Sequence, residues 1–370
     1  MIKIKYPTNS QIRFDFENDY LSIFEISDYA RVRYTAFRNF LPNPVIPVTL
    51  DELLVLNFKD LSRCCFEQQL LNERHIKRWL KKFFDYKKYQ SKIAAFFMKN
   101  KKHVALSTCY YCNIDYINSF LDIGDYIDGF DFVQRATKDE YQKIFGIGQA
   151  IADKIDQQKT TINSVEDLNG VNDKIKSNIN NFILNDQHNH FTLDHVLCQD
   201  DFPITALCLY NFVPSCYSCN SKFKKSEHIV NNYTETYLSP TSVDFSVEDD
   251  IVIDLTFPLV QKWENVKSES DFLLDFSFKY TLAGYSNYLD VFKIKGRYVF
   301  HKDIALNLIE KAQKYPISQI AEFSKITNRS VETIKSDIFG SEIFEGNCED
   351  KPFSKFKREI ARNIDLQTVN

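Results

Sequence analysis

Four of the nine cysteines fall into two pairs with the same spacing, one in STCYYCN and the other in PSCYSCN. Two Cys-x-x-Cys pairs can supply four thiolates to one tetrahedral zinc ion, whereas a single pair would suit a redox couple equally well. The predicted ligands of a structural zinc ion are Cys109, Cys112, Cys216 and Cys219. The other cysteines are expected to be buried as small hydrophobic residues, and they are Cys64, Cys65, Cys198, Cys208 and Cys348.

A carboxylate and an imidazole stand side by side in FTLDHVL, residues 191–197, an otherwise apolar segment typical of a short strand. Successive side chains of a strand alternate between its faces, so one of these groups would be buried, which is unfavourable without a partner. Asp194 and His195 are therefore expected either to cap a turn or to take part in chemistry. A neutral histidine can accept a proton from water, and carboxylate and amide oxygens can hold a divalent cation.

The two cysteine pairs are separated by 103 residues, far more than a simple zinc ribbon needs, which indicates an insertion. Within residues 134–184, Gly146 and Gly148 stand between two apolar patterns of helical period, which predicts a tight turn between helices. The same outline recurs about 24 residues later at Gly170, with Asn172 in place of the second glycine. Asparagine is the next best residue for a left-handed conformation, so Asn172 is expected to adopt one.

This pattern resembles a tandem helix-hairpin-helix module of the kind seen in the competence DNA receptor. The lead-in ATKDEYQKI and the linker NSVEDL also resemble that family. The resemblance implies that backbone N–H groups of the hairpins hold DNA phosphates without reading base sequence. A purely structural helical spacer is the alternative. The implied DNA contacts are Gly146, Gly148, Lys154, Gly170 and Lys174, with Lys176 as a further source of charge.

The Asp-His pair followed by ALxLYNFVPSCxxCNSK resembles the HNH (ββα-metal) nuclease of bacterial anti-phage defence systems of the Septu type, including retron-associated versions. The resemblance implies that His195 is the general base and that Asn211 holds the hairpin that aims it. It also implies that Asp194 and Asn220 are ligands of a catalytic Mg²⁺ or Mn²⁺ ion.

Other segments extend this resemblance and limit it. Lys222 or Lys224, at the start of the helix after the second cysteine pair, is the implied phosphate contact. The loop after the Asp-His pair is acidic, LCQDD, where the family often has Pro and Lys, so this loop departs from the family pattern. Two C-terminal segments, YLDVFKIKGRYVFHKDIALNLIEKA and IFGSEIFEGNCEDKPFSKFKREIA, also resemble these nucleases.

Taken together, these features predict a metal-dependent HNH endonuclease that cleaves DNA as the effector of an anti-phage defence system. The resemblance implies an ATPase partner protein encoded nearby, and the chain has no GxxxxGK[ST] phosphate-binding loop of its own. RNA is the alternative substrate, because metal-assisted phosphodiester cleavage does not itself distinguish the sugars. Two alternatives lack catalysis: a zinc-held nucleic-acid-binding module, and an adaptor whose helical flanks bind a partner.

The composition fits a soluble globular protein, with 44% hydrophobic and 26% charged residues among 370. A net charge of −4 gives no global basic character, so any nucleic-acid contact must be local. The N-terminal segment lacks the apolar core of a signal peptide, and no apolar run is long enough to cross a membrane. We therefore expect a cytoplasmic protein with no membrane partner.

We expect an α+β, helix-rich fold in which an HNH core, held by a zinc site of four cysteines, carries a helical insertion and helical flanks. The expected parts are a helical N-terminal region (1–105), the first half of the nuclease (106–133), the helix-hairpin-helix insertion (134–184), the nuclease core (185–235) and a mixed, then helical, C-terminal region (236–370).

Smaller patterns complete the prediction. Alternating residues between about 245 and 283 predict short strands that form a small sheet. Residues 317–338 have the outline of a helix-turn-helix, but we interpret them as an ordinary helical pair. His188 and His190 are interpreted as solvated turn residues, and His301 as a packing residue.

Overall fold

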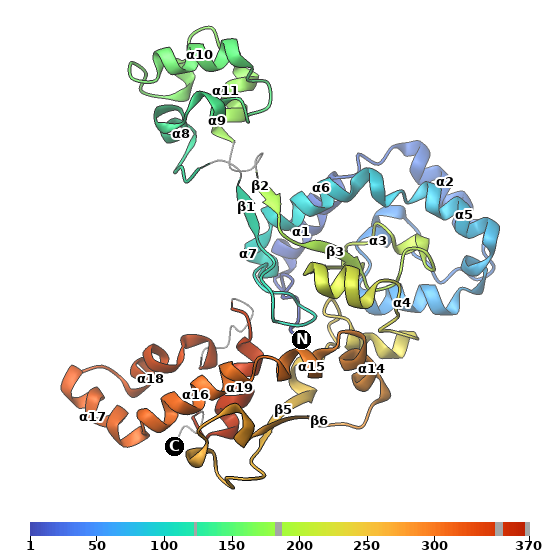
Figure 1. Cartoon of the computed structure of the whole chain (residues 1–370). Coiled ribbons are helices and arrows are strands. Elements are labelled where there is room, and N and C mark those ends of the chain that lie inside the picture. Colours follow the sequence, from blue (N-terminus) through green and yellow to red (C-terminus); the bar gives the residue numbers. More distant parts are fainter. Residues whose placement is uncertain (122–123, 182–186, 345–350, 367–370) are drawn as a thin grey trace. The chain divides into compact units, whose positions relative to one another are not determined.

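The computed structural model describes residues 1–121, 124–181, 187–344 and 351–366. It is helix-rich, with three small two-stranded antiparallel sheets in the described part of the chain (Figure 1). The chain divides into two compact units. Unit 1 comprises Met1–Ile117 and Phe191–Asn370, and unit 2 comprises Asn118–His190. None of the described helices is long and apolar enough to cross a membrane.

The N-terminal part of unit 1 is helical. Several of its helices have a polar N-cap residue that stabilises the first turn, and Thr49 and Glu52 form a complete capping box. The helices are α1 (Ser10–Ser22), α2 (Asp28–Phe40), α3 (Leu50–Leu54), α4 (Phe58–Glu67), η1 (Gln69–Asn72), α5 (Arg74–Phe83), α6 (Tyr86–Lys99) and α7 (Lys101–Val104).

A short hairpin followed by a helical turn forms the centre of unit 1. Strand β3 (Thr192–His195) pairs antiparallel with β4 (Phe212–Ser215), and the register places His195 opposite Phe212. The connection contains η3 (Pro203–Thr205) and η4 (Leu209–Asn211), and the wide helical turn η5 (Ser218–Lys224) follows β4. The second cysteine pair begins directly after β4, so hairpin, cysteines and helix are consecutive.

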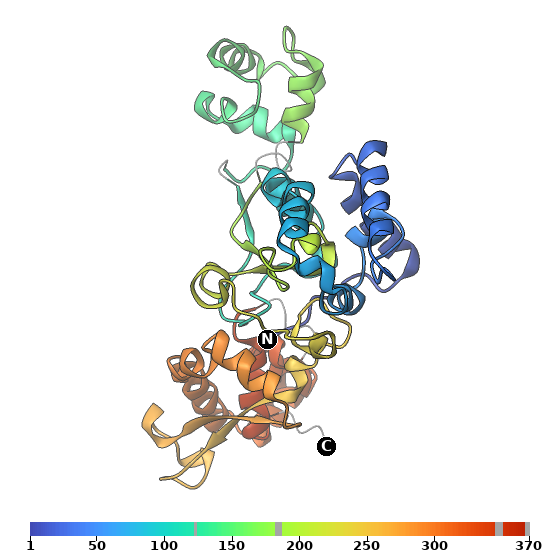
Figure 2. The same ribbon diagram turned by 90° about the vertical axis from the view of Figure 1, so that its right-hand side faces the viewer.

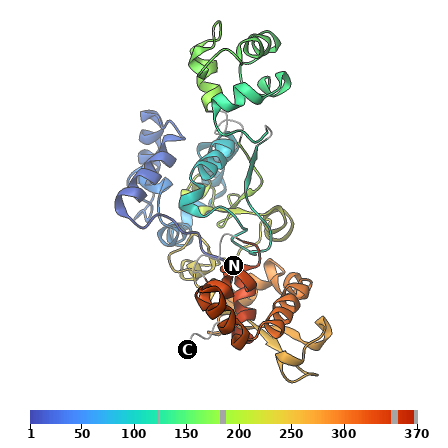
Figure 3. The same ribbon diagram turned by 90° about the vertical axis from the view of Figure 1, so that its left-hand side faces the viewer.

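The C-terminal part of unit 1 contains a second hairpin and several helices. Strands β5 (Ile251–Thr256) and β6 (Leu273–Phe278) pair antiparallel, as the alternating pattern predicted, and Ile251, Ile253 and Leu255 are buried. Figures 2 and 3 show these strands beside the last helices. The helices are η6 (Tyr233–Leu238), α13 (Val247–Asp250), η7 (Trp263–Asn265), η8 (Glu269–Asp271), α14 (Ala283–Val291), α15 (Ile294–Val299), α16 (Lys302–Lys314), α17 (Ile317–Thr327), α18 (Val331–Phe339), η9 (Ser341–Ile343) and α19 (Ser354–Asn363).

Unit 1 is continuous, although the sequence suggested four separate parts for it. Its buried apolar residues form one cluster that runs from Met1 to Leu366. The N-terminal segment joins distant parts, because Ile2 N–H donates to the Tyr110 carbonyl and Ile4 N–H donates to the Pro240 carbonyl, both at 2.9 Å. The expected boundaries at residues 105 and 235 therefore fall inside a single packed body.

Unit 2 has a hydrophobic core of its own. Its strands β1 (Ser119–Leu121) and β2 (Gln187–Asn189) pair antiparallel where the chain enters and leaves the unit. Between them lie α8 (Gly129–Arg135), α9 (Lys138–Tyr141), α10 (Gln149–Gln158), η2 (Val165–Asp167) and α11 (Asp173–Asn180). Phe132 and Val133 belong to its core, so the unit begins before residue 134, where the sequence placed the boundary.

The two predicted turns of unit 2 share one design. Gly146 and Gly170 have φ angles of +92° and +71°, the left-handed region that glycine tolerates best. Gly148 and Asn172 instead have φ angles of −93° and −74° and are the N-cap residues of α10 and α11. The expectation of a left-handed Asn172 is wrong, because its side chain accepts the Ile175 N–H at 2.9 Å and caps the helix.

We predict different effects for substitutions at the two glycines of the first turn. Gly146→Ala should destabilise unit 2 by about 1–2 kcal/mol, because a left-handed backbone is costly for alanine. Gly148→Ser should be neutral or stabilising, since serine is a favoured N-cap and a Cβ there meets no atom within 4 Å. Hydrogen exchange of unit 2 in the full chain measures both effects, and equal destabilisation would contradict the assignment.

Candidate metal centre and Asp-His site

Four buried cysteine side chains converge in unit 1. The Sγ atoms of Cys109, Cys112, Cys216 and Cys219 all lie within 4.8 Å of one another, and Cys112 and Cys216 are 4.0 Å apart. Thiolates around one tetrahedral zinc ion are about 3.8 Å apart, given Zn–S bonds of about 2.3 Å. The four side chains therefore fit a metal ion such as zinc, as the two Cys-x-x-Cys pairs predicted.

Backbone N–H groups support the cluster. The N–H of Cys216 points at Cys109 Sγ, that of Ile114 at Cys112 Sγ and that of Cys219 at Cys216 Sγ, each at 3.4 Å. These hydrogen bonds stabilise thiolates and help to fix the positions of these three sulfurs. The remaining described cysteines, Cys64, Cys65, Cys198 and Cys208, are buried and free, as expected, while Cys348 lies outside the described residues.

An arginine that the sequence motifs did not reveal lies against the cysteine cluster. Arg297 of α15 points its guanidinium at Cys219 Sγ (3.2 Å) and Cys112 Sγ (3.4 Å), and it pairs with Asp115 at 3.3 Å. Four thiolates leave a zinc ion with a net charge of −2, and the guanidinium offsets part of this charge. Arg297 stands 78 residues beyond Cys219, and no spacing rule in the sequence connects them.

Asp194 is buried and fully engaged by protein groups. The Tyr111 hydroxyl donates to Asp194 Oδ2 at 2.5 Å, and the Lys224 ammonium donates to Oδ1 at 3.2 Å. Burial raises the pKa of Asp194, and the nearby Lys224 charge opposes this shift. Because Tyr111 lies between Cys109 and Cys112 in sequence, the first cysteine pair also positions the Asp194 carboxyl group.

The two lysines proposed as phosphate contacts differ in exposure. The Lys224 side chain is completely buried, and its ammonium also donates to the His195 carbonyl at 2.8 Å. Lys224 therefore holds the end of β3 and is not available to a phosphate, which corrects that alternative. Lys222 is exposed, so it remains the candidate phosphate contact at this helical turn.

His195 is held by a backbone carbonyl. Its Nε2 atom lies 3.0 Å from the carbonyl oxygen of Ala206, in the loop between β3 and β4. A carbonyl can only accept, so Nε2 carries the proton and Nδ1 is left as the basic nitrogen. The described residues make no hydrogen bond to Nδ1. The rings of Tyr86 and Phe212 pack against the imidazole at 4.6 and 4.8 Å.

Asn211 locks the loop that carries Ala206. Its Oδ1 accepts the Leu197 N–H at 2.8 Å, and its Nδ2 donates to the Leu197 carbonyl at 3.0 Å and to the Thr205 hydroxyl at 2.9 Å. One buried side chain thus joins the start of the loop, just after His195, to the residue before Ala206. Asn211 therefore fixes the two ends of this loop relative to each other.

The residues proposed for a catalytic cation do not form a cation site in this arrangement. Both oxygens of Asp194 are occupied by Tyr111 and Lys224, and the half-buried Asn220 turns its Nδ2 toward the Leu193 carbonyl at 3.4 Å. Among groups of three or more His, Cys, Asp or Glu side chains in the described part of the chain, only the cysteine cluster could hold a metal. The positive charge beside Asp194 is the ammonium of Lys224.

The acidic loop after the Asp-His pair is paired within the protein. Lys81 of α5 lies 2.6 Å from Asp200, and His228 lies 3.0 Å from Asp201. These acidic side chains therefore fasten the loop to its neighbours.

The histidines outside the site are placed close to expectation. His188 and His190 are exposed, although His188 lies in strand β2, where its ring stacks on Phe120. His301 packs on Phe353 at 4.7 Å, as the packing interpretation predicted.

In unit 2 the residues proposed for DNA contact lie near the two turns. Lys154 and Lys174 are exposed, and Lys154 Nζ would lie 3.5 Å from a Cβ placed on Gly170. Lys176 donates to the Glu166 carbonyl at 2.6 Å. The unit as a whole is acidic, however, with twelve Asp and Glu against seven Lys and Arg.

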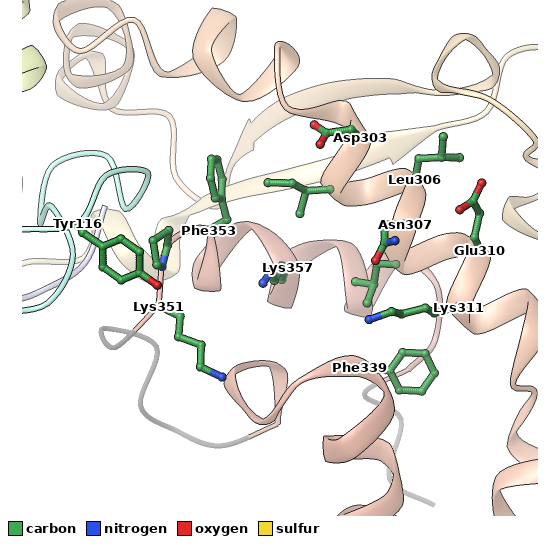
Figure 4. A pocket seen from close by; sticks show the side chains of 13 residues that line it. Tyr116, Asp303, Leu306, Asn307, Glu310, Lys311, Phe339, Lys351, Phe353 and Lys357 are labelled. Atoms are coloured by element: carbon green, nitrogen blue, oxygen red, sulfur yellow. The ribbon is translucent and has the colours of Figure 1, made fainter.

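A cavity of about 660 Å³ lies elsewhere in unit 1, next to α16 (Figure 4). Its lining includes Lys351 and Lys357, whose ammonium groups pair with Glu342 at 3.0 and 2.8 Å. Asp194, His195, Asn211 and Asn220 do not line this cavity, so it is separate from the Asp-His site.

Comparison with protein-family models, curated proteins and solved structures gave no match.

We predict that the purified protein carries about one zinc ion per chain, because four thiolates saturate one tetrahedral site. Cys112→Ser or Cys216→Ser should lose the metal and unfold unit 1, since metal-binding energy contributes to folding. Elemental analysis and circular dichroism measure the two effects, with Cys64→Ser as a matched buried control that retains zinc. An intact fold without zinc in the unaltered protein would contradict the assignment.

We also predict that His195 is neutral, with its proton on Nε2, throughout the physiological pH range. Burial lowers its pKa from 6.5 to about 4. The folded chain therefore binds fewer protons than the unfolded chain between these values, so His195 favours unfolding as the pH falls from 6.5 toward 4. Proton–nitrogen correlation NMR reports the tautomer directly. A charged His195 at pH 6, or a proton on Nδ1, would contradict the geometry.

Proposed function

We propose that the chain is a nuclease of the HNH (ββα-metal) type that hydrolyses phosphodiester bonds in DNA, with His195 as the general base. The observation that carries this proposal is the orientation of His195, whose Nε2 is bound to the Ala206 carbonyl while Nδ1 has no partner among the described residues. The order of hairpin, cysteine pair and helical turn supports the same assignment.

In the proposed mechanism, His195 acts on the attacking water. Its low pKa keeps the imidazole neutral, so Nδ1 can accept a proton as the water oxygen bonds to phosphorus. The bond from phosphorus to the leaving sugar oxygen breaks, and that oxygen takes up a proton from solvent. The Ala206 carbonyl accepts the Nε2–H bond and stabilises the imidazolium that forms. Asn211 keeps this carbonyl in place, and Lys224 holds the backbone of His195.

Dependence on Mg²⁺ or Mn²⁺ is part of this proposal only because the family resemblance implies it. The present arrangement does not fit a bound divalent cation, because Lys224 and Tyr111 occupy the Asp194 oxygens. We assign no chemical step to such an ion. The resemblance of residues 194–222 is also the basis for proposing an anti-phage role and an ATPase partner.

Phosphate binding by unit 2 belongs to the same proposal. The first hairpin supports it better, because Gly148 has no side chain to cap the N-terminal N–H groups of α10, whereas the Asn172 side chain already accepts the Ile175 N–H of α11.

A second candidate function is a nucleic-acid-binding or adaptor protein without catalysis. Two observations favour it: the Asp194 carboxyl group is fully paired inside the protein, and His195 is only 7% exposed. Under this alternative the Asp-His pair, Tyr111 and Lys224 form a structural network that fastens the hairpin to the first cysteine pair. Substitution of His195 separates the two functions.

We predict that His195→Ala lowers DNA cleavage by a factor of about 10² to 10⁴, the usual loss for a general base, while zinc content and DNA binding persist. His190→Ala, at an exposed position in unit 2, is the control and should cleave normally. Cleavage of labelled DNA and RNA is measured with Mg²⁺, with Mn²⁺ and without either ion, in the presence of any partner ATPase. A fully active His195→Ala protein would contradict the assigned role.

A further inference from the structure

Positive charge is concentrated in one part of unit 1. Residues 74–102, which form α5, α6 and the start of α7, contain eleven Lys and Arg but only one acidic residue, Asp85. The whole chain has a net charge of −4, and unit 2 is acidic. The local charge in this segment is therefore opposite in sign to that of the chain as a whole.

Helix α5 presents its positive charges on one side. Five basic residues fall within an arc of about 140°, at 100° per residue, and span about 12 Å along the axis. Ile76 and Leu80 lie on the opposite side and are buried. We call the five residues the α5 basic face, and they are Arg74, Lys77, Arg78, Lys81 and Lys82.

The α5 basic face is largely unpaired inside the protein. Lys81 pairs with Asp200, but the other four make no ion pair with any described residue. Residues 74, 78 and 82 follow each other at intervals of four, as do 77 and 81, and like charges at this spacing destabilise a helix. The arrangement therefore costs stability, which an anionic partner would offset.

The face adjoins the Asp-His site. Helix α5 packs on η3, which leads directly into Ala206, the residue whose carbonyl holds His195. Lys81 reaches the same loop through Asp200, and Tyr86, three residues after the end of α5, lies edge-on to His195 at 4.6 Å. A polyanion on this face would lie next to the loop that orients the proposed general base.

The surroundings of the face favour duplex DNA as its partner over a membrane or an unpaired strand. The apolar side of α5 is buried in unit 1, so it cannot enter a lipid surface. Trp79 stacks on Phe83 at 5.0 Å, and Arg33 lies over both rings, so these aromatic rings are not free to stack on bases. What remains exposed on α5 itself is mainly positive charge, which suits the phosphates of a double helix.

We propose that the α5 basic face binds the phosphate backbone of duplex DNA and directs it to the Asp-His site. The inference rests on the proposed function for the identity of the substrate. This inference places the main DNA-binding surface in unit 1, whereas the sequence motifs predicted that surface in the hairpins of unit 2.

The test measures DNA binding separately from cleavage. Full-length protein carrying His195→Ala is titrated with fluorescent duplex DNA at several salt concentrations. We compare a face variant (Lys77→Glu, Arg78→Glu, Lys82→Glu) with a control variant of equal charge change at exposed lysines of the same unit (Lys262→Glu, Lys267→Glu, Lys279→Glu). A milder face variant with Gln at the same positions covers the case in which charge reversal disturbs folding.

We expect the face variant to bind about tenfold or more weakly than the control variant at moderate salt. The slope of log affinity against log salt should become shallower by about 0.9 for each phosphate that the variant no longer neutralises. Equal affinities for the face and control variants would overturn the proposal. So would a loss of binding only on Lys154→Glu and Lys174→Glu, or face-dependent binding to phosphatidylglycerol vesicles in place of DNA.

Cleavage assays on the unaltered chain, and on face variants that retain His195, separate this inference from the proposed function. If the unaltered chain binds DNA through the face but never cleaves it, the nuclease assignment fails and the face stands. If it cleaves DNA and the face variants bind and cleave normally, the nuclease assignment stands and the face fails.

Discussion

The convergence of four thiol groups is the constraint on which the rest of unit 1 depends. Cys109 and Cys112 precede unit 2, whereas Cys216 and Cys219 follow the β3–β4 hairpin, so the cluster joins two segments far apart in sequence. From the first pair, Tyr111 reaches the Asp194 carboxyl group. The orientation of the Asp-His pair is therefore coupled to the closure of the cysteine cluster.

An insertion of this length would make such a closure entropically costly if it were a loose loop. The chain avoids this cost because unit 2 folds on a core of its own and begins and ends in the paired strands β1 and β2. Its ends are further joined by the hydrogen bond from His190 N–H to the Asn118 carbonyl. The two segments that carry the cysteine pairs are thus brought together although a folded unit separates them in the sequence.

Features that are determined by residues close together in the sequence could be predicted. Features that depend on packing between segments far apart in the sequence could not. The spacing of the cysteines, the alternation in β5 and the turn at Gly146 are all determined within a few residues. The sequence pattern correctly placed Asn172 in the second turn, but the expected left-handed backbone is wrong, because Asn172 caps the helix. Both roles favour asparagine, so the residue type alone does not distinguish them. Arg297 and the burial of Lys224 depend on packing between distant segments, which no short motif encodes.

Lys224 and the lysines of α5 have different roles in unit 1, because burying a charged group is unfavourable unless a partner satisfies it. Lys224 is completely buried and stable only because Asp194 and the His195 carbonyl satisfy its ammonium, so it serves the internal structure of the hairpin. Apart from Lys81, which pairs with Asp200, the lysines of α5 make no ion pair with a described residue, so they are available to an anion, and each like-charge neighbour costs little. Buried charge thus fixes the proposed general base, and exposed charge on the adjoining helix provides the surface on which a polyanionic substrate can be held beside it.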